Sequence, residues 1–428
     1  MERFSSLFKT LRPCQACEYA LLISVAAVLP FSWHISFYLL SLLVISAITS
    51  TIVTKQTGIR NHSLLRLISL VAMGLLPLVY LASLLYSSNV EEGKTEVLRK
   101  MLLLAYAVTF LVFDWSFLTR KRLLGILQFM TAALLVRFAI RLGISTHNIV
   151  SGRIHLSECV GFFFDPMHHG YLSMYILLSV AYLVYVALRK EETERPHKIL
   201  AYSSLIVSII ILTAYLFILQ SRSGILGLIL LAIGVLLFIF FKLRRYLLGV
   251  VLLSCIAAVV AAVLLAVPTS QHRLSDTLAK VAVHDQSDER YIISKASLNV
   301  VKDNMPWGVG AGDRIDELVA EYQRMGAEKQ YWRRYNPHNQ FVDTLMTTGI
   351  VGLLVLSIIL ILPAVDCFKD KNYLFLAFLF MVALSALFES ILERQMGINF
   401  FCFLYCLFMV WFVNYRTKAV TNLRSHFS

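Results

Sequence analysis

Long apolar runs recur along the whole chain and constrain its fold more than any other feature of the sequence. Each run holds about twenty residues, the length of an α-helix that crosses the hydrocarbon core of a bilayer. A transmembrane barrel would need shorter segments that alternate between apolar and polar residues. Hydrophobic residues make up 58% of the 428 residues, and charged residues only 15%. The sequence therefore predicts an all-α polytopic membrane protein.

About twelve transmembrane helices are expected from these runs. Their approximate ranges are 17–33, 35–54, 64–86, 101–117, 123–142, 167–188, 199–219, 224–241, 246–268, 340–365, 373–391 and 397–414. An even number of spans places both ends of the chain on one side of the membrane. Lys and Arg concentrate in the loops of that side, which indicates cytoplasmic termini. The formal net charge of +13 is explained by this topology, so nucleic acid is not an expected partner.

One polar stretch, residues 269–338, is much longer than the other connections and faces outward in this topology. A loop of this length is usually functional or disordered. Apolar residues recur at helical spacing from Ile315 to Met325, and a weaker helical pattern covers 288–303. A break that contains Pro and Gly, residues 306–310, separates the two patterns. We therefore expect a partly helical cap on a membrane domain.

The sequence thus divides into three expected parts. Residues 1–268 hold transmembrane helices 1–9, residues 269–338 form the large outer loop, and residues 339–428 hold helices 10–12 and a cytoplasmic tail. The loop 143–166 and the tight turn 220–224 also face outward. Polar groups of these outer segments are the first candidates for a functional site.

Arg222 is the sharpest of these candidates. It sits in a turn of very few residues between two apolar runs, so its guanidinium is held near the membrane. Charges at membrane depth are costly and usually functional, although an arginine can also snorkel to lipid headgroups. Arg290 lies in the large loop. Because a planar guanidinium binds phosphate oxygens bidentately, both arginines suit a phosphate or diphosphate headgroup.

Three further residues on the outer side have a functional and a simpler interpretation. Arg137 and Arg141 are one helical turn apart, so they share a helix face and suit either a site or lipid phosphate. His169 suits either the lining of a site or ordinary packing.

Acidic residues occur in two places on the outer side. Glu389 and Glu393 lie one turn apart near the outer end of the eleventh span, where an ion pair with Arg394 is the simplest expectation. A second cluster, in the large loop, is more simply explained as solvated side chains than as a metal site. Its members are Asp285, Asp288 and Glu289. No metal or cofactor is expected.

His338 follows Pro337 and begins the tenth span, so the helix start fixes its backbone. A histidine can take a proton from a hydroxyl group near neutral pH. The alternative is a helix-terminal residue that bonds loop carbonyls. Together, His338 as a base and the two arginines as a diphosphate clamp would form a site with an entrance that faces the bilayer. Such a site suits the transfer of a group from a lipid-diphosphate carrier to an acceptor hydroxyl. The chain has neither a Walker-type glycine loop nor a serine nucleophile elbow.

Two parts of the chain carry a resemblance to a known family. His338-Asn339, nine further residues, and then Gly349 and Gly352 resemble the H-[NSQ]-x9-G-x-x-G motif of bacterial O-antigen ligases. Arg290 and the segment 304–310 resemble the periplasmic loop of the wider O-antigen ligase and polymerase superfamily, as does the closing Asn-Pro-His-Asn. The two glycines also suit the close approach of helices in lipid.

The resemblance implies a GT-C-like fold and a metal-independent, inverting glycosyltransferase. Its donor would be O-polysaccharide on undecaprenyl diphosphate, and its acceptor the lipid A-core of lipopolysaccharide, at the periplasmic face of the bacterial inner membrane. Arg222 and Arg290 would hold the diphosphate, and His338 would activate the acceptor hydroxyl. Asn339 is expected to contact substrate beside His338. Arg137, Arg141, His169 and Glu389 are expected to contribute further substrate contacts. The family's late acidic residue would correspond to Glu389, although Asp is expected there.

Other functions use the same features. An O-antigen polymerase takes the same donor but a growing lipid-linked glycan as acceptor, and more often has two substantial periplasmic loops. An O-linking oligosaccharyltransferase would need a site for a protein. A transporter or flippase would place charges along a central path, whereas here they cluster at one face. The ligase is the function that the sequence favours.

Overall fold

The computed structural model describes residues 11–425 except 56, 59–63, 154–162, 164–166, 189–197, 244–249 and most of 252–288. Within this part of the chain the secondary structure is helical and contains no strand. Eleven α-helices lie at expected spans: α2 (Pro13–Val28), α3 (Trp33–Thr54), α4 (Leu64–Ser83), α5 (Val90–Val112), α6 (Arg120–Val150), α8 (His169–Ala187), α9 (Lys198–Ile218), α10 (Arg222–Leu237), α16 (Gln340–Lys369), α17 (Tyr373–Ala386) and α18 (Gln395–Ser425). The ninth expected span, 246–268, falls mostly outside the described residues.

Among the described residues, six helices are long and apolar enough to cross a membrane: α3, α4 with its 3₁₀ extension Leu84–Tyr86, α6, α8, α10 with the start of the π-helix Phe238–Leu243, and α16. Four shorter apolar helices accompany them, over Pro13–Val28, Tyr202–Ile218, Tyr373–Ala386 and Gln395–Val410. The chain is a multi-pass membrane protein, and the number of twelve spans stays a prediction.

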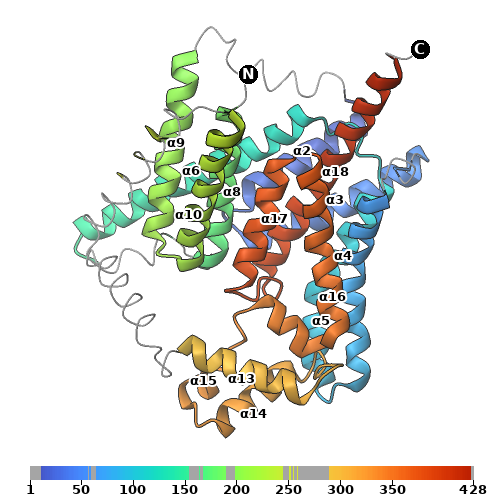
Figure 1. Cartoon of the computed structure of the whole chain (residues 1–428), viewed down its shortest axis with the longest axis vertical. Helices are drawn as coiled ribbons and strands as arrows, with labels where there is room; N and C mark the ends of the chain where they lie inside the picture. Colours follow the sequence, from blue (N-terminus) through green and yellow to red (C-terminus); the bar gives the residue numbers. More distant parts are fainter. Residues whose placement is uncertain are drawn as a thin grey trace. The chain divides into compact units, whose positions relative to one another are not determined.

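The described helices form two compact units. The first unit comprises residues 1–129, 287–379 and 386–428, and the second comprises 130–286 and 380–385. In the first unit α4 runs beside both α5 and α16, and α18 packs against α5 and α3 (Figure 1). In the second unit α8 is the central helix, buried along most of its length and in contact with α9 and α10.

The predicted cap helices are present in the first unit. They are α13 (Glu289–Asp303) and α14 (Arg314–Arg324), and a short helix that the sequence did not reveal, α15 (Glu328–Arg333), follows them near one end of α16 (Figure 1). The apolar face of α14 places Leu318 and Tyr322 in a core with Ile293 of α13 and Met346 of α16. Burying an apolar side chain of this size stabilises a fold by roughly 1.5–3 kcal/mol. The cap is therefore packed onto α16.

The helix α16 is broken at Gly349, whose φ of 65° and ψ of −157° are not helical. The connection between α13 and α14 satisfies the backbone groups that the break releases. The amides of Val309 and Gly310 donate to the carbonyls of Met346 and Thr347, each at 2.9 Å, and the amide of Ile350 donates to the carbonyl of Pro306 at 2.9 Å. A buried backbone group needs such a partner. The glycine of the motif thus serves this docking, where the sequence suggested only close helix packing.

Two helix ends differ from the hydropathy limits of the expected spans. The helix α6 continues to Val150, eight residues into the expected loop 143–166. Conversely, α17 ends at Ala386, so residues 387–394 form a connection to α18 and not the end of a span. Hydropathy indicates which residues lie within the membrane. A helix instead ends where its backbone groups form hydrogen bonds outside the helix. Glu389 and Glu393 therefore lie on a loop and not on one helix face.

Candidate functional site

His338 lies immediately before α16 and has a left-handed backbone, with φ of 48°. This conformation is uncommon for a residue other than glycine. Two neighbours hold it in place. The side-chain oxygen of Asn336 accepts from the His338 amide at 3.0 Å, and the side-chain oxygen of Asn339 caps α16 by accepting from the amides of Phe341 and Val342. The helix starts at Gln340, the first residue of the expected span 340–365, so His338 precedes the helix by two residues.

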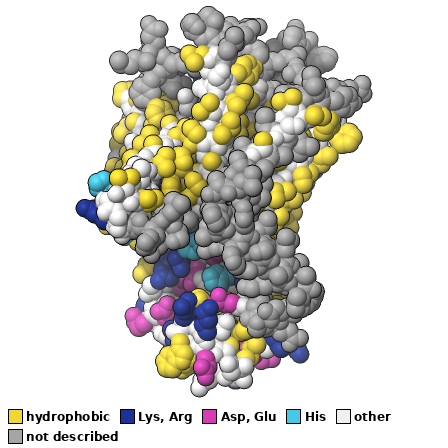
Figure 2. All heavy atoms as spheres, turned by 90° about the vertical axis from the view of Figure 1, so that its left-hand side faces the viewer, with side chains coloured by type: hydrophobic (Ala, Val, Ile, Leu, Met, Phe, Trp, Pro, Cys, Tyr) yellow, Lys and Arg dark blue, Asp and Glu magenta, His cyan; other side chains and the backbone are white. Residues whose placement is uncertain are grey.

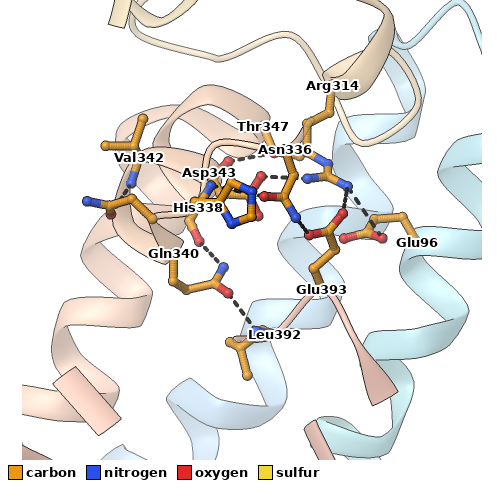
Figure 3. Close-up of polar contacts among 12 residues, drawn as sticks. Glu96, Arg314, Asn336, His338, Gln340, Val342, Asp343, Thr347, Leu392 and Glu393 are labelled. Atoms are coloured by element: carbon orange, nitrogen blue, oxygen red, sulfur yellow. Dashed lines mark hydrogen bonds and ion pairs between the residues drawn. The ribbon is translucent and has the colours of Figure 1, made fainter. Parts of the chain in front are cut away.

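The imidazole of His338 contacts the loop that joins α17 and α18. Its Nδ1 lies 3.1 Å from Oε2 of Glu389, and the two side chains are 29% and 17% exposed. The same loop is tied to α16 because the Leu392 amide donates to the side-chain oxygen of Gln340 at 2.6 Å (Figure 3). Residues 51 positions apart thus form a histidine–carboxylate pair at a partly open position.

This pair gives His338 a defined chemical form. A carboxylate accepts a hydrogen bond, so in the neutral imidazole Nδ1 carries the proton and Nε2 keeps its lone pair. A histidine held in this way by an acidic residue can take a proton through Nε2 from a hydroxyl group. The arrangement suits general base catalysis.

A buried network of charges lies beside the pair, and Arg314 is its centre (Figure 3). This first residue of α14 donates to Asp343 of α16 at 2.6 Å and to Glu393 at 3.2 Å, and lies 4.0 Å from Glu96 of α5. Glu96 also pairs with Lys100. Burial alone would raise the pKa of Glu96, but Lys100 and Arg314 lower it to about 2. Burial would likewise lower the pKa of Arg314, yet the three carboxylates raise it well above its usual value.

Glu393 therefore pairs with Arg314 and not with its neighbour Arg394, which corrects the expected local ion pair. Glu393 also accepts from the side-chain amide of Asn336. The sequence analysis missed Arg314, Asp343 and Asn336. A signal for Asp343 was present, because an acidic residue inside a strongly apolar span is usually functional.

Arg290 lies in the same unit, as the second residue of α13. Its guanidinium carbon is 5.8 Å from the centre of the Phe388 ring, beside Glu389 in the chain. The side chain is exposed, as a group that binds a headgroup must be. In Figure 2, acidic, basic and His side chains gather on the part of the surface that the cap forms. Asp285 and Asp288 lie outside the described residues, and Glu289 pairs with Lys329 at 3.2 Å.

The remaining candidate residues belong to the second unit. Arg222 is exposed and opens α10, which Ser221 caps by accepting from the Gly224 amide at 3.2 Å. Arg137 is buried, and its Nε donates to the hydroxyl of Tyr215 at 3.2 Å. Arg141 and His169 are half-buried, on α6 and at the start of α8. That these residues share a site with His338 stays a prediction.

Among the described residues, no group of three or more His, Cys, Asp or Glu side chains is arranged to hold a metal ion. The five described cysteines are free thiols: Cys14, Cys17, Cys367, Cys402 and Cys406.

Part of the chain matches a known family. Residues 206–357 match the family model of O-antigen ligases. The match supports membership in the O-antigen ligase family. The match runs from α9 into α16 beyond its break at Gly349, and so contains Arg222, Arg290, Arg314 and His338. The loop with Glu389 follows it. No curated protein is significantly similar to the chain. The resemblance seen in the sequence motif is confirmed, and the match supports the wider superfamily of O-antigen ligases and polymerases.

Proposed function

We propose that this O-antigen ligase family member attaches O-polysaccharide to the lipid A-core of lipopolysaccharide. The observation that carries the proposal is the contact of 3.1 Å between Nδ1 of His338 and Oε2 of Glu389. It leaves Nε2 of a partly exposed histidine as a proton acceptor, at the start of a membrane helix. A glycosyl transfer to a hydroxyl group needs such a base.

The donor in this proposal is O-polysaccharide linked to undecaprenyl diphosphate. Arg222 and Arg290 hold its diphosphate, because guanidinium groups bind phosphate oxygens bidentately and neutralise the charge of the leaving group. We assign the side-chain nitrogen of Asn339 to a substrate oxygen, since its side-chain oxygen already caps α16. Arg141 and His169 are assigned to further substrate contacts. Arg137 supports them through Tyr215.

The proposed reaction is a direct displacement. The oxygen of a core hydroxyl forms a bond to the anomeric carbon of the glycan, and the bond from that carbon to the diphosphate oxygen breaks. The hydroxyl proton goes to Nε2 of His338, whose positive charge Glu389 then stabilises. Undecaprenyl diphosphate leaves, and the anomeric centre is inverted. The step uses neither a metal nor a cofactor.

We place the reaction at the periplasmic face of the bacterial inner membrane. The support is the distribution of Lys and Arg among the loops, which puts the cap on the side opposite both termini. Membrane lipid is then the environment of the donor, and the lipid A-core reaches the cap from the same leaflet.

Lipopolysaccharide of a deletion strain tests the function. We expect that all long O-chains are lost from lipid A-core while lipid-linked polymer accumulates, and that the wild-type gene restores them. Lipopolysaccharide that carries a single repeat unit would instead assign the protein to the polymerases. Unchanged lipopolysaccharide with an altered glycoprotein would assign it to the O-linking oligosaccharyltransferases.

A further inference from the structure

The buried charge network joins four segments that are far apart in the sequence. Arg314 belongs to α14 in the cap, Glu96 to α5, Asp343 to the first turn of α16, and Glu393 to the loop between α17 and α18. The first three side chains are buried, as is Lys100. Replacing a buried ion pair by apolar residues is often neutral or stabilising, so stability alone is a weak reason for such a network. Its geometry has a more specific consequence.

A continuous chain of contacts leads from Arg314 to the backbone of His338. The guanidinium holds Glu393 at 3.2 Å, and Glu393 accepts from the side-chain nitrogen of Asn336. The side-chain oxygen of Asn336 then accepts from the amide of His338 at 3.0 Å. Only one orientation of the Asn336 side-chain amide allows it to donate to Glu393 and to accept from the His338 amide at the same time. Arg314 therefore fixes the amide group that holds His338.

The same arginine also fixes the loop that carries Glu389. Glu393 is four residues after Glu389, and Leu392 between them donates to the side chain of Gln340. Arg314 simultaneously donates to Asp343, one turn into the helix that begins after His338. The guanidinium of Arg314 thus bridges the loop that carries Glu389 and the helix α16, which begins two residues after His338.

The backbone of His338 makes such support necessary. A left-handed conformation at a residue other than glycine persists only where the surroundings over-determine it. Here the determinants are the Asn336 side chain on one side and the cap of α16 by Asn339 on the other.

We propose that Arg314 is a positioning residue: it sets the geometry of the His338–Glu389 pair through Glu393, Asn336 and Asp343. This inference rests on the proposed function for its kinetic consequence. A misplacement of about 1 Å by a residue remote from the chemistry can cost about 10²-fold in rate. Because Arg314 is buried and acts on His338 only through Glu393, Asn336 and Asp343, its loss should lower kcat and leave the KM for the lipid-linked donor unchanged.

The kinetic arm compares purified Arg314→Lys, Arg314→Gln and Glu393→Gln proteins, with Arg324→Gln as the control. Arg324 carries the same charge on the same helix, but its side chain is 63% exposed and pairs with Glu321 of that helix, outside the network. We expect kcat about 10²-fold lower for Arg314→Gln, an intermediate value for Arg314→Lys, which keeps the charge but loses the planar fork, and no change for Arg324→Gln. The double variant Arg314→Lys, Glu393→Gln should be no slower than the slower single variant, since both act through one chain of contacts.

The second arm needs no substrate. Hydrogen exchange in lipid nanodiscs should show faster exchange in residues 387–394 and 336–343 of Arg314→Gln, and unchanged exchange in α2, which packs against α3 in the same unit. Faster exchange across the whole first unit would overturn the inference, because it would mean a general loss of packing. Multiplicative rate effects in the double variant, or an effect on KM alone, would overturn it as well. A wild-type protein without transferase activity would contradict the proposed function, whereas the exchange arm would still decide the role of Arg314.

Discussion

In the proposed mechanism Glu389 controls which nitrogen of His338 accepts a proton, and this makes it the most informative single residue of the pair. In Glu389→Gln the side-chain amide can donate to Nδ1, which favours the tautomer with the proton on Nε2. That tautomer cannot take a proton from an acceptor hydroxyl. We expect kcat to fall by about 10²–10⁴-fold, as measured with purified protein, lipid-linked glycan and lipid A-core.

The control for this variant is Glu328→Gln, which removes an exposed carboxylate from α15 in the same cap. It should transfer glycan at the wild-type rate. Equal activity of Glu389→Gln and Glu328→Gln, at equal protein levels, would remove Glu389 from the mechanism.

The two exposed arginines allow a prediction about the donor. Lys keeps the positive charge but has no planar fork, so it rescues a bidentate phosphate contact poorly. A hydrogen bond to a charged group contributes about 1.5–3 kcal/mol, so Arg222→Lys and Arg290→Lys should each raise the KM for the donor by roughly tenfold or more. Arg324→Lys is the matched control. Full ligation by both Arg→Ala variants would exclude the clamp.

The sequence predicted single residues well where the cause is local. His338 follows a proline, begins an apolar run and stands in a motif, and each of these signals depends only on its neighbours in the chain. Its partner was harder to find because Glu389 lies 51 residues away. The partner of Glu393 was predicted wrongly, because Arg314 reaches Glu393 only in the folded chain.

At the scale of secondary structure, the break in α16 is the feature on which the cap depends. The φ and ψ of Gly349 lie in a region that only glycine adopts readily, and a Cβ there would collide with the carbonyl oxygen of Pro306. Gly349→Ala should therefore destabilise the docking of the cap by at least about 1–3 kcal/mol. Thermal unfolding in detergent, with proteolysis of the cap as a second readout, measures the loss.

A second glycine gives the comparison for this variant. Gly143 lies within α6, and a Cβ added there meets no atom within 4 Å. Gly143→Ala should leave the unfolding temperature unchanged or raise it, because alanine is the better helix former by about 1 kcal/mol. If Gly349→Ala unfolded at the same temperature as Gly143→Ala, the break would not hold the cap.

The existence of most helices could be predicted, but not all of their ends. Apolar runs and helical spacing depend on composition over many residues, so the spans and the two longer cap helices α13 and α14 were found. The connection after α17 is held by a tertiary contact, the hydrogen bond from the Leu392 amide to the side chain of Gln340. The bonds between Pro306–Gly310 and α16 are likewise invisible to any local pattern.

For the whole molecule, the distribution of basic residues makes a claim about topology. Both termini should be cytoplasmic and the cap periplasmic. In a cysteine-free background, a membrane-impermeant thiol reagent should label Cys introduced at Gly326 in the cap but not Cys introduced at Ser425 until the cells are opened. The reverse pattern would contradict the topology and, with it, the periplasmic site.

The sequence predicted a membrane protein with many spans because composition alone decides that property. It could not predict that the chain folds as two units with residues 380–385 of α17 in the second unit. Such a division depends on which helix faces pack together. Strongly apolar helices are similar on every face, so their sequences do not show which face meets which neighbour.

The central claim is that His338 is the general base, and the turnover of His338→Asn and His338→Gln tests it most directly. Asn accepts the left-handed backbone of this position more readily than most residues, and both side chains can keep a hydrogen bond to Glu389, but neither takes a proton. With purified protein, lipid-linked glycan and lipid A-core, we predict that both variants are folded and bind donor normally, and that their kcat is lower by about 10²–10⁴-fold. Near-normal turnover by either variant would contradict the account.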